Sequence, residues 1–276
     1  MKHLIKSYFR FLWNSSNAHG VHSPFVFNLV TKCFYDKKQY SEYKILDDYR
    51  NSLLENKEVI EVTDFGAGSR VFKSNKRAVN QIAKNAGISA KRAKLLFRLL
   101  HYFQPKKVLE IGTSLGLATS ALALNNFSSL TTLEGCPNTL KQCQLQFKRF
   151  KINNVTFINT EFSEQLSKYK STSFDFIYFD GNHSKEATLN YFTTLLPTAH
   201  NDSVWIFDDI HWSVQMEEAW EVIKNHPQVT VCIDTFQWGF VFFRKEQEQE
   251  NFIIRVDQSF FLDAVLGIKN LWGLIK

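Results

Sequence analysis

The chain has 276 residues, of which 44% are hydrophobic, and its formal net charge at pH 7 is +6. This apolar content is enough for a sizeable core and argues against intrinsic disorder. The positive charge would suit nucleic acid, an anionic lipid surface or an acidic substrate, but its spread along the chain requires none of them. The four cysteines form no C-x-x-C pair and no zinc spacing, which predicts reduced thiols in a cytoplasmic protein.

Both ends of the chain are aromatic and basic, and we expect an amphipathic helix at each. The apolar stripes of these helices fall on Ile5, Tyr8, Phe9 and Leu12, and on Phe261, Ala264, Val265, Ile268 and Trp272. Such helices pack on their own domain or on a twin subunit in a homodimer, or they make peripheral contact with a membrane. No uninterrupted apolar run is long enough to span a bilayer.

Three regions are expected along the chain. Residues 1–90 are irregular, aromatic and basic, and we interpret them as an N-terminal cap that covers the substrate. Residues 91–244 alternate strand-like and helix-like segments and carry the ligand-binding domain. Residues 245–276 begin with a charged linker, KEQEQEN, and continue into the C-terminal amphipathic helix.

The middle region predicts a mainly parallel sheet with helices on both faces. In chain order, the expected elements are a helix over 90–103, a strand over 107–112, a helix over 114–124, a strand over 130–134, a helix over 137–150, strands over 155–159 and 174–180, a helix ending at 195, a strand over 203–208, a helix over 214–224, and a closing antiparallel pair over 229–234 and 238–243. This alternation is typical of a Rossmann-like, doubly wound α/β fold with seven strands.

A glycine turn follows the first strand of this region, in the sequence EIGTSLG at 110–116. Gly112 lets the chain turn sharply, and Gly116 lets the next helix lie close to a ligand or a strand. Ser114 stands where a pyrophosphate loop would have its second glycine, which favours a ligand without phosphates. Either Thr113 or Ser114 is available as the helix cap. An ordinary turn of an α/β protein would also have this pattern.

Acidic residues follow the next two strands. Glu134 lies 22 residues after Gly112, and a carboxylate about 20 residues beyond such a turn is placed to accept both ribose hydroxyls. Glu161 and Phe162 follow the third strand, where an acidic group can meet an adenine amine and an aromatic ring can cover the base. Exposed loop residues are the alternative interpretation of all three.

The segments VLEIGTSLG, LTTLEG, FDFIYFDGNH and SVWIFDDIHW together resemble the class I S-adenosylmethionine-dependent methyltransferases. Within these enzymes, the chain is most similar to the catechol O-methyltransferase-like small-molecule group, over about residues 91–244. The resemblance implies that S-adenosylmethionine is the cofactor. It implies a cofactor site in which Glu110, Gly112, Thr113, Ser114 and Gly116 surround the methionine part, Glu134 binds the ribose, Glu161 and Phe162 meet the adenine, and Asp180 lies nearby.

Three carboxylates form a candidate metal site. Asp180, Asp208 and Asp209 follow the fourth and fifth strands, whose ends should lie side by side and could hold Mg²⁺. The catechol-type enzymes place an aspartate and then an aspartate–asparagine pair at the matching positions, so Asp209 departs from their pattern. In the alternative arrangement, Asp180 holds the cofactor ammonium while the other two aspartates cap a helix.

Two histidines lie just beyond these aspartates. Because imidazole titrates near neutrality, either His183 or His211 is a candidate general base, with Asp180 as a third candidate for handling the proton. Loop histidines of this kind are otherwise simply solvated or hydrogen-bonded.

The sequence therefore predicts a methyltransferase that acts on a small hydroxyl-bearing acceptor. An RNA or other nucleic-acid methyltransferase is one alternative, although Phe179-Asp-Gly-Asn-His183 replaces the Asn/Asp-Pro-Pro-aromatic motif of enzymes that methylate base amines. A non-catalytic scaffold that keeps the cofactor fold is the other alternative. The intact Gly112, Gly116 and Glu134 argue against it.

Overall fold

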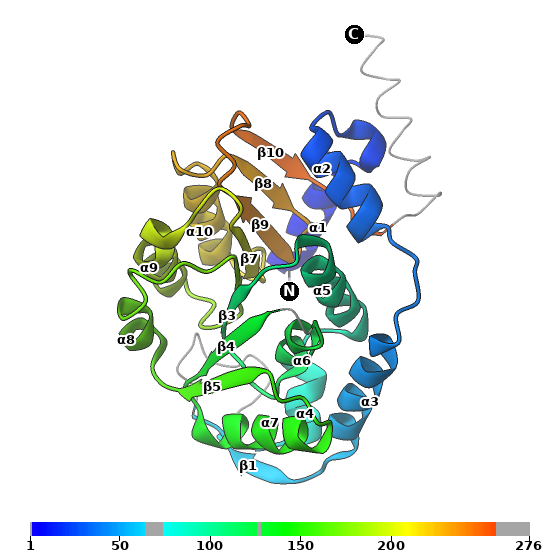
Figure 1. Cartoon of the computed structure of the whole chain (residues 1–276), viewed down its shortest axis with the longest axis vertical. Coiled ribbons are helices and arrows are strands. Elements are labelled where there is room, and N and C mark those ends of the chain that lie inside the picture. The colour runs from blue at the N-terminus through cyan, green and yellow to red at the C-terminus, as the bar shows by residue number, and fades with distance from the viewer. Residues whose placement is uncertain (1, 64–73, 126–127, 258–276) are drawn as a thin grey trace.

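The structure is a computed structural model that describes residues 2–63, 74–125 and 128–257 (Figure 1). The predicted C-terminal helix over residues 261–272 lies outside the described residues. The described chain is organised around one eight-stranded sheet and a separate two-stranded sheet.

The central sheet confirms the Rossmann-like α/β prediction. Its strand order is β10 (Glu250–Ile253), β8 (Val231–Asp234), β9 (Trp238–Phe242), β7 (Val204–Asp208), β6 (Phe176–Phe179), β3 (Lys107–Ile111), β4 (Ser129–Glu134) and β5 (Val155–Asn159). The strands from β7 to β5 are parallel, while β9 runs antiparallel to β7 and to β8, as expected for the closing pair. The chain winds outward in both directions from β3, so that the strand order reverses between β3 and β6.

One strand more than the predicted seven is present. β10 pairs in parallel with β8 at the edge of the sheet and lies in the stretch predicted as a charged linker and helix. The linker prediction was wrong for this stretch because the charges of KEQEQEN conceal a short apolar segment behind it. Phe252 is buried and Ile254 is fully buried against the rest of the molecule.

Helices cover both faces of the sheet. On one face lie α3 (Glu42–Glu55), α5 (Ala90–Phe103), α6 (Leu117–Ala123) and α7 (Pro137–Arg149), and on the other lie α8 (Phe162–Ser167), α9 (Lys185–Leu195) and α10 (Val214–Lys224). Figure 1 shows α8, α9 and α10 gathered on one side of the strands and α3, α5 and α6 on the other. The two faces carry separate hydrophobic clusters, which is the layering expected of a doubly wound sheet.

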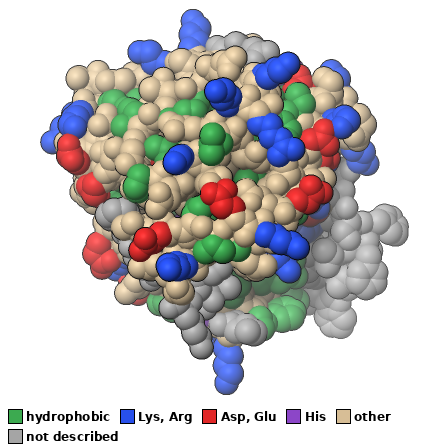
Figure 2. All heavy atoms as spheres, turned by 90° about the horizontal axis from the view of Figure 1, so that it is seen from below, with side chains coloured by type: hydrophobic (Ala, Val, Ile, Leu, Met, Phe, Trp, Pro, Cys, Tyr) green, Lys and Arg blue, Asp and Glu red, His purple; other side chains and the backbone are tan. Residues whose placement is uncertain are grey.

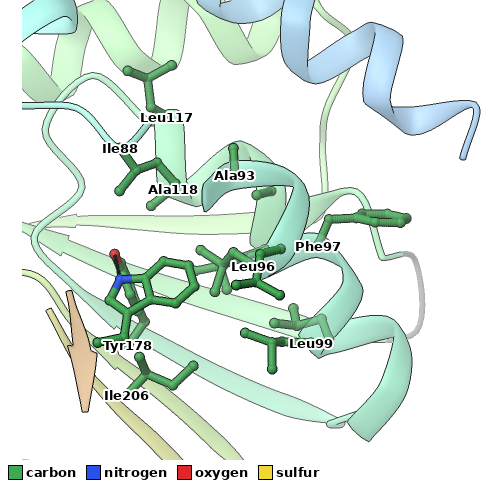
Figure 3. Close-up of a cluster of buried hydrophobic side chains, with 14 of the residues drawn as sticks. Ile88, Ala93, Leu96, Phe97, Leu99, Leu117, Ala118, Tyr178 and Ile206 are labelled. Carbon is green, nitrogen blue, oxygen red and sulfur yellow. Dashed lines mark hydrogen bonds between the residues drawn. The ribbon is translucent and has the colours of Figure 1, made fainter. Parts of the chain in front are cut away.

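Helix α5 follows its sequence signals closely. The hydroxyl of Ser89 accepts a hydrogen bond from the amide of Arg92 at the start, and Gln104 adopts a left-handed conformation directly before Pro105 at the end. The buried residues of the helix include Leu96 and Leu99. Figure 3 shows these side chains facing the sheet beside Tyr178 and Ile206. The start of α5 is therefore held rigidly above β6 and β7.

Residues 1–90 are not irregular, contrary to the prediction. They form α1 (Lys2–Asn14), α2 (Pro24–Leu29), α3 and α4 (Val79–Asn85), together with β1 (Val59–Glu61) paired to β2 (Lys76–Ala78). These helices are short or mix polar residues into their buried faces, which blurs the 3.6-residue period. Helix α1 buries Ser7 and Phe11, whereas Phe9 of the predicted packing stripe is 66% exposed.

We expect Leu96→Ala to lower the free energy of unfolding by about 2–5 kcal/mol, because it leaves a cavity between α5 and the sheet. Leu96 is fully buried, while Leu145, on α7, is 53% exposed. Denaturant unfolding of the full chain would measure the change, with Leu145→Ala as a matched control. Equal effects of the two substitutions would contradict the packing described for α5.

Candidate active site

The glycine turn after β3 lies at the point where the strand order reverses. Gly112 has a φ of +103°, and a Cβ atom there would lie 2.2 Å from the backbone oxygen of Asp180. Gly116 has a φ of +78°, and its Cβ would lie 2.5 Å from the Cys143 sulfur. Ser114 also adopts a left-handed φ, of 48°. The turn thus needs glycine at both positions, because it packs on the chain after β6 at Gly112 and on the side chains of α7 and α3 at Gly116.

Glu134 is fixed beside this turn. One of its carboxylate oxygens accepts the Ser114 amide at 2.7 Å, and the other accepts the Cys136 amide at 2.8 Å. Burial raises the pKa of Glu134, although these hydrogen bonds oppose the shift. A carboxylate has about four acceptor sites in all, so each oxygen keeps capacity for a further donor such as a ribose hydroxyl.

Glu110 lies inside the sheet below the turn and is fully buried. Its Oε2 accepts hydrogen bonds from the Thr119 and Thr132 hydroxyls, both at 2.6 Å, and Thr132 is in turn 2.5 Å from the Thr113 hydroxyl. The other oxygen, Oε1, has no hydrogen-bond partner. Burial raises the pKa of Glu110 to about 8. An unpaired carboxylate oxygen at this depth would be stabilised by a cation or a strong donor.

Glu161 and Phe162 begin α8, next to the turn after β6. The Glu161 carboxylate caps the helix by accepting the Glu164 amide at 3.0 Å. A Cβ at Gly181 would lie 2.5 Å from the Phe162 ring, and this ring meets Tyr191 edge-on at 6.1 Å between centroids. Phe162 therefore borders the site, whereas the side chain of Glu161 is exposed and engaged with its own helix.

Two small pockets open at this edge of the sheet. One is lined by the glycine turn and Asp180, and also by Ile82, Gly87 and Ile88 from the region before α5. The other is lined by Gly181, His183, Thr188, Tyr191 and Asp208, among others. Residues of the N-terminal region thus contribute to the first pocket, although the sequence did not single out these three residues.

Asp180 and His183 form a pair between the two pockets. The imidazole Nε2 lies 3.5 Å from an Asp180 carboxylate oxygen. Burial and the charge of Asp208 raise the pKa of Asp180 to about 7. Burial alone would lower the pKa of His183, but the hydrogen bond to Asp180 and the neighbouring aspartate charges raise it to about 9. The pair therefore holds at least one proton near neutral pH.

His211 lies in a different environment. Its Nδ1 is 2.7 Å from Glu217 and its Nε2 is 2.8 Å from Asp234, and its ring stacks on Phe236. Burial alone would lower the pKa of His211, but the two carboxylates raise it. With both nitrogens engaged, the imidazolium ties the segment after β7 to α10 and to the end of β8.

Asp208 is enclosed by protein groups. It forms an ion pair with the Arg92 guanidinium, accepts the Tyr178 hydroxyl at 2.8 Å and accepts the Asp209 amide at 2.7 Å. Within residues 2–63, 74–125 and 128–257, no three His, Cys, Asp or Glu side chains are arranged to hold a metal ion. Because both oxygens of Asp208 already have partners, the aspartates in this arrangement do not fit a magnesium ion.

Sequence reasoning missed Arg92, Tyr178 and Trp238 as parts of this site. Tyr178 and Trp238 are strand residues whose period indicates only burial. Arg92 carried a weak signal, because a basic residue in the first turn of a helix opposes the helix dipole and so needs a partner elsewhere.

Comparison with known proteins identifies the domain. Residues 109–210 match the family model described as "Methyltransferase domain". These residues therefore form a methyltransferase domain. The match to this methyltransferase family model spans the glycine turn, Glu134, Asp180 and both aspartates after β7. No curated protein matches the chain.

Solved structures share the methyltransferase fold at low identity. The SAH-bound methyltransferase PaMTH1 from Podospora anserina is 12% identical, with a TM-score of 0.57 over 82% of this chain and 97% of that one. The O-methyltransferase from Bacillus cereus, in complex with SAH, is 19% identical, with a TM-score of 0.50 over 74% and 90%. The O-methyltransferase TomG from Streptomyces achromogenes, in complex with SAM, is 14% identical, with a TM-score of 0.52 over 75% and 91%.

If Glu134 holds the ribose of this methyltransferase's cofactor, Glu134→Ala should weaken S-adenosylhomocysteine binding about tenfold or more. Losing hydrogen bonds to a charged acceptor typically costs on the order of 1.5–3 kcal/mol. Titration calorimetry on the full chain would measure the affinity, with the exposed Glu55→Ala as control. Unchanged affinity in Glu134→Ala would remove this residue from the cofactor site.

Proposed function

We propose that this methyltransferase transfers the methyl group of S-adenosylmethionine to the hydroxyl oxygen of a small acceptor. The observation that carries the proposal is the Asp180–His183 pair, which lies against the glycine turn and borders a second pocket. A hydroxyl loses its proton on methylation, and such a pair can receive it. The structural neighbours from Bacillus cereus and Streptomyces achromogenes are named as O-methyltransferases, which supports the same chemistry.

The residues of the turn are proposed to hold the cofactor. Gly112, Thr113, Ser114 and Gly116 would cradle the methionine part, and Glu134 would accept the ribose hydroxyls. The unpaired Oε1 of Glu110 and the carboxylate of Asp180 would accept the methionine ammonium, whose positive charge favours the ionised form of both acids. Phe162, which borders Gly181, would cover the adenine, with Glu161 at its edge.

The bound cofactor supplies a methyl group activated on sulfur. The acceptor oxygen displaces it in line, so that a C–O bond forms as the C–S bond breaks, and the protein must align the two and take up the acceptor proton. We assign the proton to His183, oriented by Asp180. His211 was the other candidate base. Because carboxylates hold both its nitrogens, we propose a structural role for it instead.

Magnesium at Asp180, Asp208 and Asp209 stays a prediction that no observation on this chain supports. The proposed reaction contains no step through a metal. The cytoplasmic location also stays a prediction. It agrees with the four cysteines, which are all buried and form no disulfide. The role of residues 1–90 as a cover is supported by the pocket residues Ile82, Gly87 and Ile88.

The alternative functions are not favoured. A nucleic-acid methyltransferase would need a continuous basic surface, and Figure 2 shows lysines and arginines mixed with acidic residues on the face that it displays. A non-catalytic scaffold would not need a half-buried histidine–carboxylate pair beside the cofactor turn. Both arguments favour catalysis on a small acceptor.

The rate of methyl transfer should rise with pH and level off above about 9. A base must be unprotonated to act, and the pKa of His183 is raised to about 9. His183→Asn should lower the rate with a weakly acidic phenol by about 10²–10⁴-fold. Transfer of labelled methyl from S-adenosylmethionine to a panel of phenols would measure this.

A phenol that is already ionised at neutral pH provides the control, because its methylation needs no base and should survive His183→Asn. Equal losses for both phenols would assign His183 to binding rather than proton transfer. Labelling of amines but of no hydroxyl acceptor would overturn O-methylation itself.

Helix α1 supports a second proposal, peripheral contact with an anionic membrane. Ile5 and Phe9 are 52% and 66% exposed, and the basic Lys2, Lys6 and Arg10 flank them on the helix surface. None of the helices among the described residues is long and apolar enough to cross a membrane. An exposed aromatic stripe next to a basic one suits a helix lying in the interface. A homodimer contact is the other use predicted for this helix.

Phe9→Glu should abolish binding to anionic vesicles, because the apolar stripe would then carry a charge into the interface. In the unmodified protein, each basic residue near the surface adds about 1 kcal/mol, so the binding should fade at high salt. Co-sedimentation with anionic and neutral vesicles would measure it, with Leu145→Glu on α7 as control. The helix would instead form a dimer contact if the unmodified protein does not pellet with vesicles and elutes as a dimer on size-exclusion chromatography, and if Phe9→Glu disrupts that dimer.

A further inference from the structure

We infer that Arg92 takes the position that a divalent cation would hold among the three aspartates, and that this enzyme transfers methyl groups without a metal. The catalytic part of this inference rests on the proposed function, but the absence of a metal site can be tested without any methyl acceptor. Arg92 lies at the start of α5, outside the motifs found in the sequence.

Arg92 closes a ring of contacts at the carboxyl ends of β6 and β7. Its guanidinium pairs with Asp208 and lies 4.8 Å from the centre of the Trp238 ring. Trp238 donates its indole N–H to the Tyr178 hydroxyl at 3.2 Å, and Tyr178 donates to Asp208 at 2.8 Å. Each member thus holds the next, so the guanidinium is fixed in position and in the orientation of its plane.

The charges explain why a cation is needed at this point. Asp180, Asp208 and Asp209 face one another closely enough for the charge of Asp208 to raise the pKa of both of the other two. Without a counterion, this cluster would be costly to bury. A guanidinium supplies one permanent positive charge at every working pH, whereas a metal ion would require two or more of these carboxylates to turn toward it.

The free donor of Arg92 argues against a metal cation beside it. Its Nε is buried and has no hydrogen-bond partner. A buried N–H calls for an oxygen acceptor and would repel a metal cation. Arg92 is therefore a positioning residue that orients Asp208.

The backbone holds Arg92 in place. Its amide bonds to the Ser89 cap, and the following turn of α5 buries Leu96 under the sheet. The neighbouring Lys91 instead pairs with Asp257 at the surface and is 72% exposed. Lys91 and Arg92 thus form a matched pair for experiment, since they share a helix turn and a charge and differ in what they contact.

The test uses the full chain saturated with S-adenosylhomocysteine. Mn²⁺ is added stepwise, and binding is measured as the loss of the electron paramagnetic resonance signal of the free ion. The unmodified protein and Lys91→Met should show no site below millimolar Mn²⁺. Arg92→Met keeps an apolar stem on Trp238 and frees the carboxylates, so it should gain one site at least about tenfold tighter. The inference is overturned if the unmodified protein binds one Mn²⁺ at micromolar concentration and Asp208→Asn abolishes that site.

Activity gives a second, independent measurement. The unmodified enzyme should keep its full rate in excess chelator, while Arg92→Met should lose roughly 10- to 100-fold and Arg92→Lys should recover part of the loss. Calorimetry with S-adenosylhomocysteine confirms that each variant is folded. Complete inactivation by chelator that Mg²⁺ reverses would overturn the inference. If the protein methylates no acceptor, the proposed function is wrong. The Mn²⁺ titration would still show whether a metal site exists.

Discussion

The structure depends on the close approach of two chain turns, the one after β3 and the one after β6. At Gly112 there is no room for a side chain, because the backbone of Asp180 occupies that space. This contact brings the glycine turn, the aspartate and the loop carrying His183 to one point at the edge of the sheet. Every feature of the candidate site, from Glu134 on one side to Asp208 on the other, is positioned relative to it.

The same contact concentrates negative charge. Glu110, Glu134, Asp180, Asp208 and Asp209 all end up buried or half-buried at one end of the parallel strands. Such a cluster can persist only if each carboxylate is protonated, hydrogen-bonded or paired. Glu134 uses backbone amides, Glu110 uses threonine hydroxyls and a raised pKa, and Asp208 uses Arg92. Glu110 and Asp180 are the acids that we propose to contact the cationic cofactor.

Most elements of the sheet domain could be predicted because their signals are local. The bounds of α5, β5 and α10 agree with the prediction residue for residue, since each has a cap, a proline or a clear period at its ends. Helix α1 was predicted from its amphipathic stripe, but the other N-terminal helices could not be, because their packing surfaces are defined by the domain that they cover. The role of Arg92 could not be predicted either, because its partner Asp208 lies 116 residues away, and only the folded sheet brings the two together.

The ends of the described chain are joined in a way that bears on how the protein is made. Ser16, just after α1, bonds to the backbone of Ile253 and Arg255, and the Arg255 side chain donates to Ser15. These partners lie at or just after the end of β10, the strand at the outer edge of the described sheet. Because synthesis proceeds from the N-terminus, α1 cannot make these contacts until the segment at 253–255 has been made. Its buried Phe11 also packs on Phe236, so this ring lacks its partner for most of the same interval, and a newly made chain would need to be protected from aggregation during it.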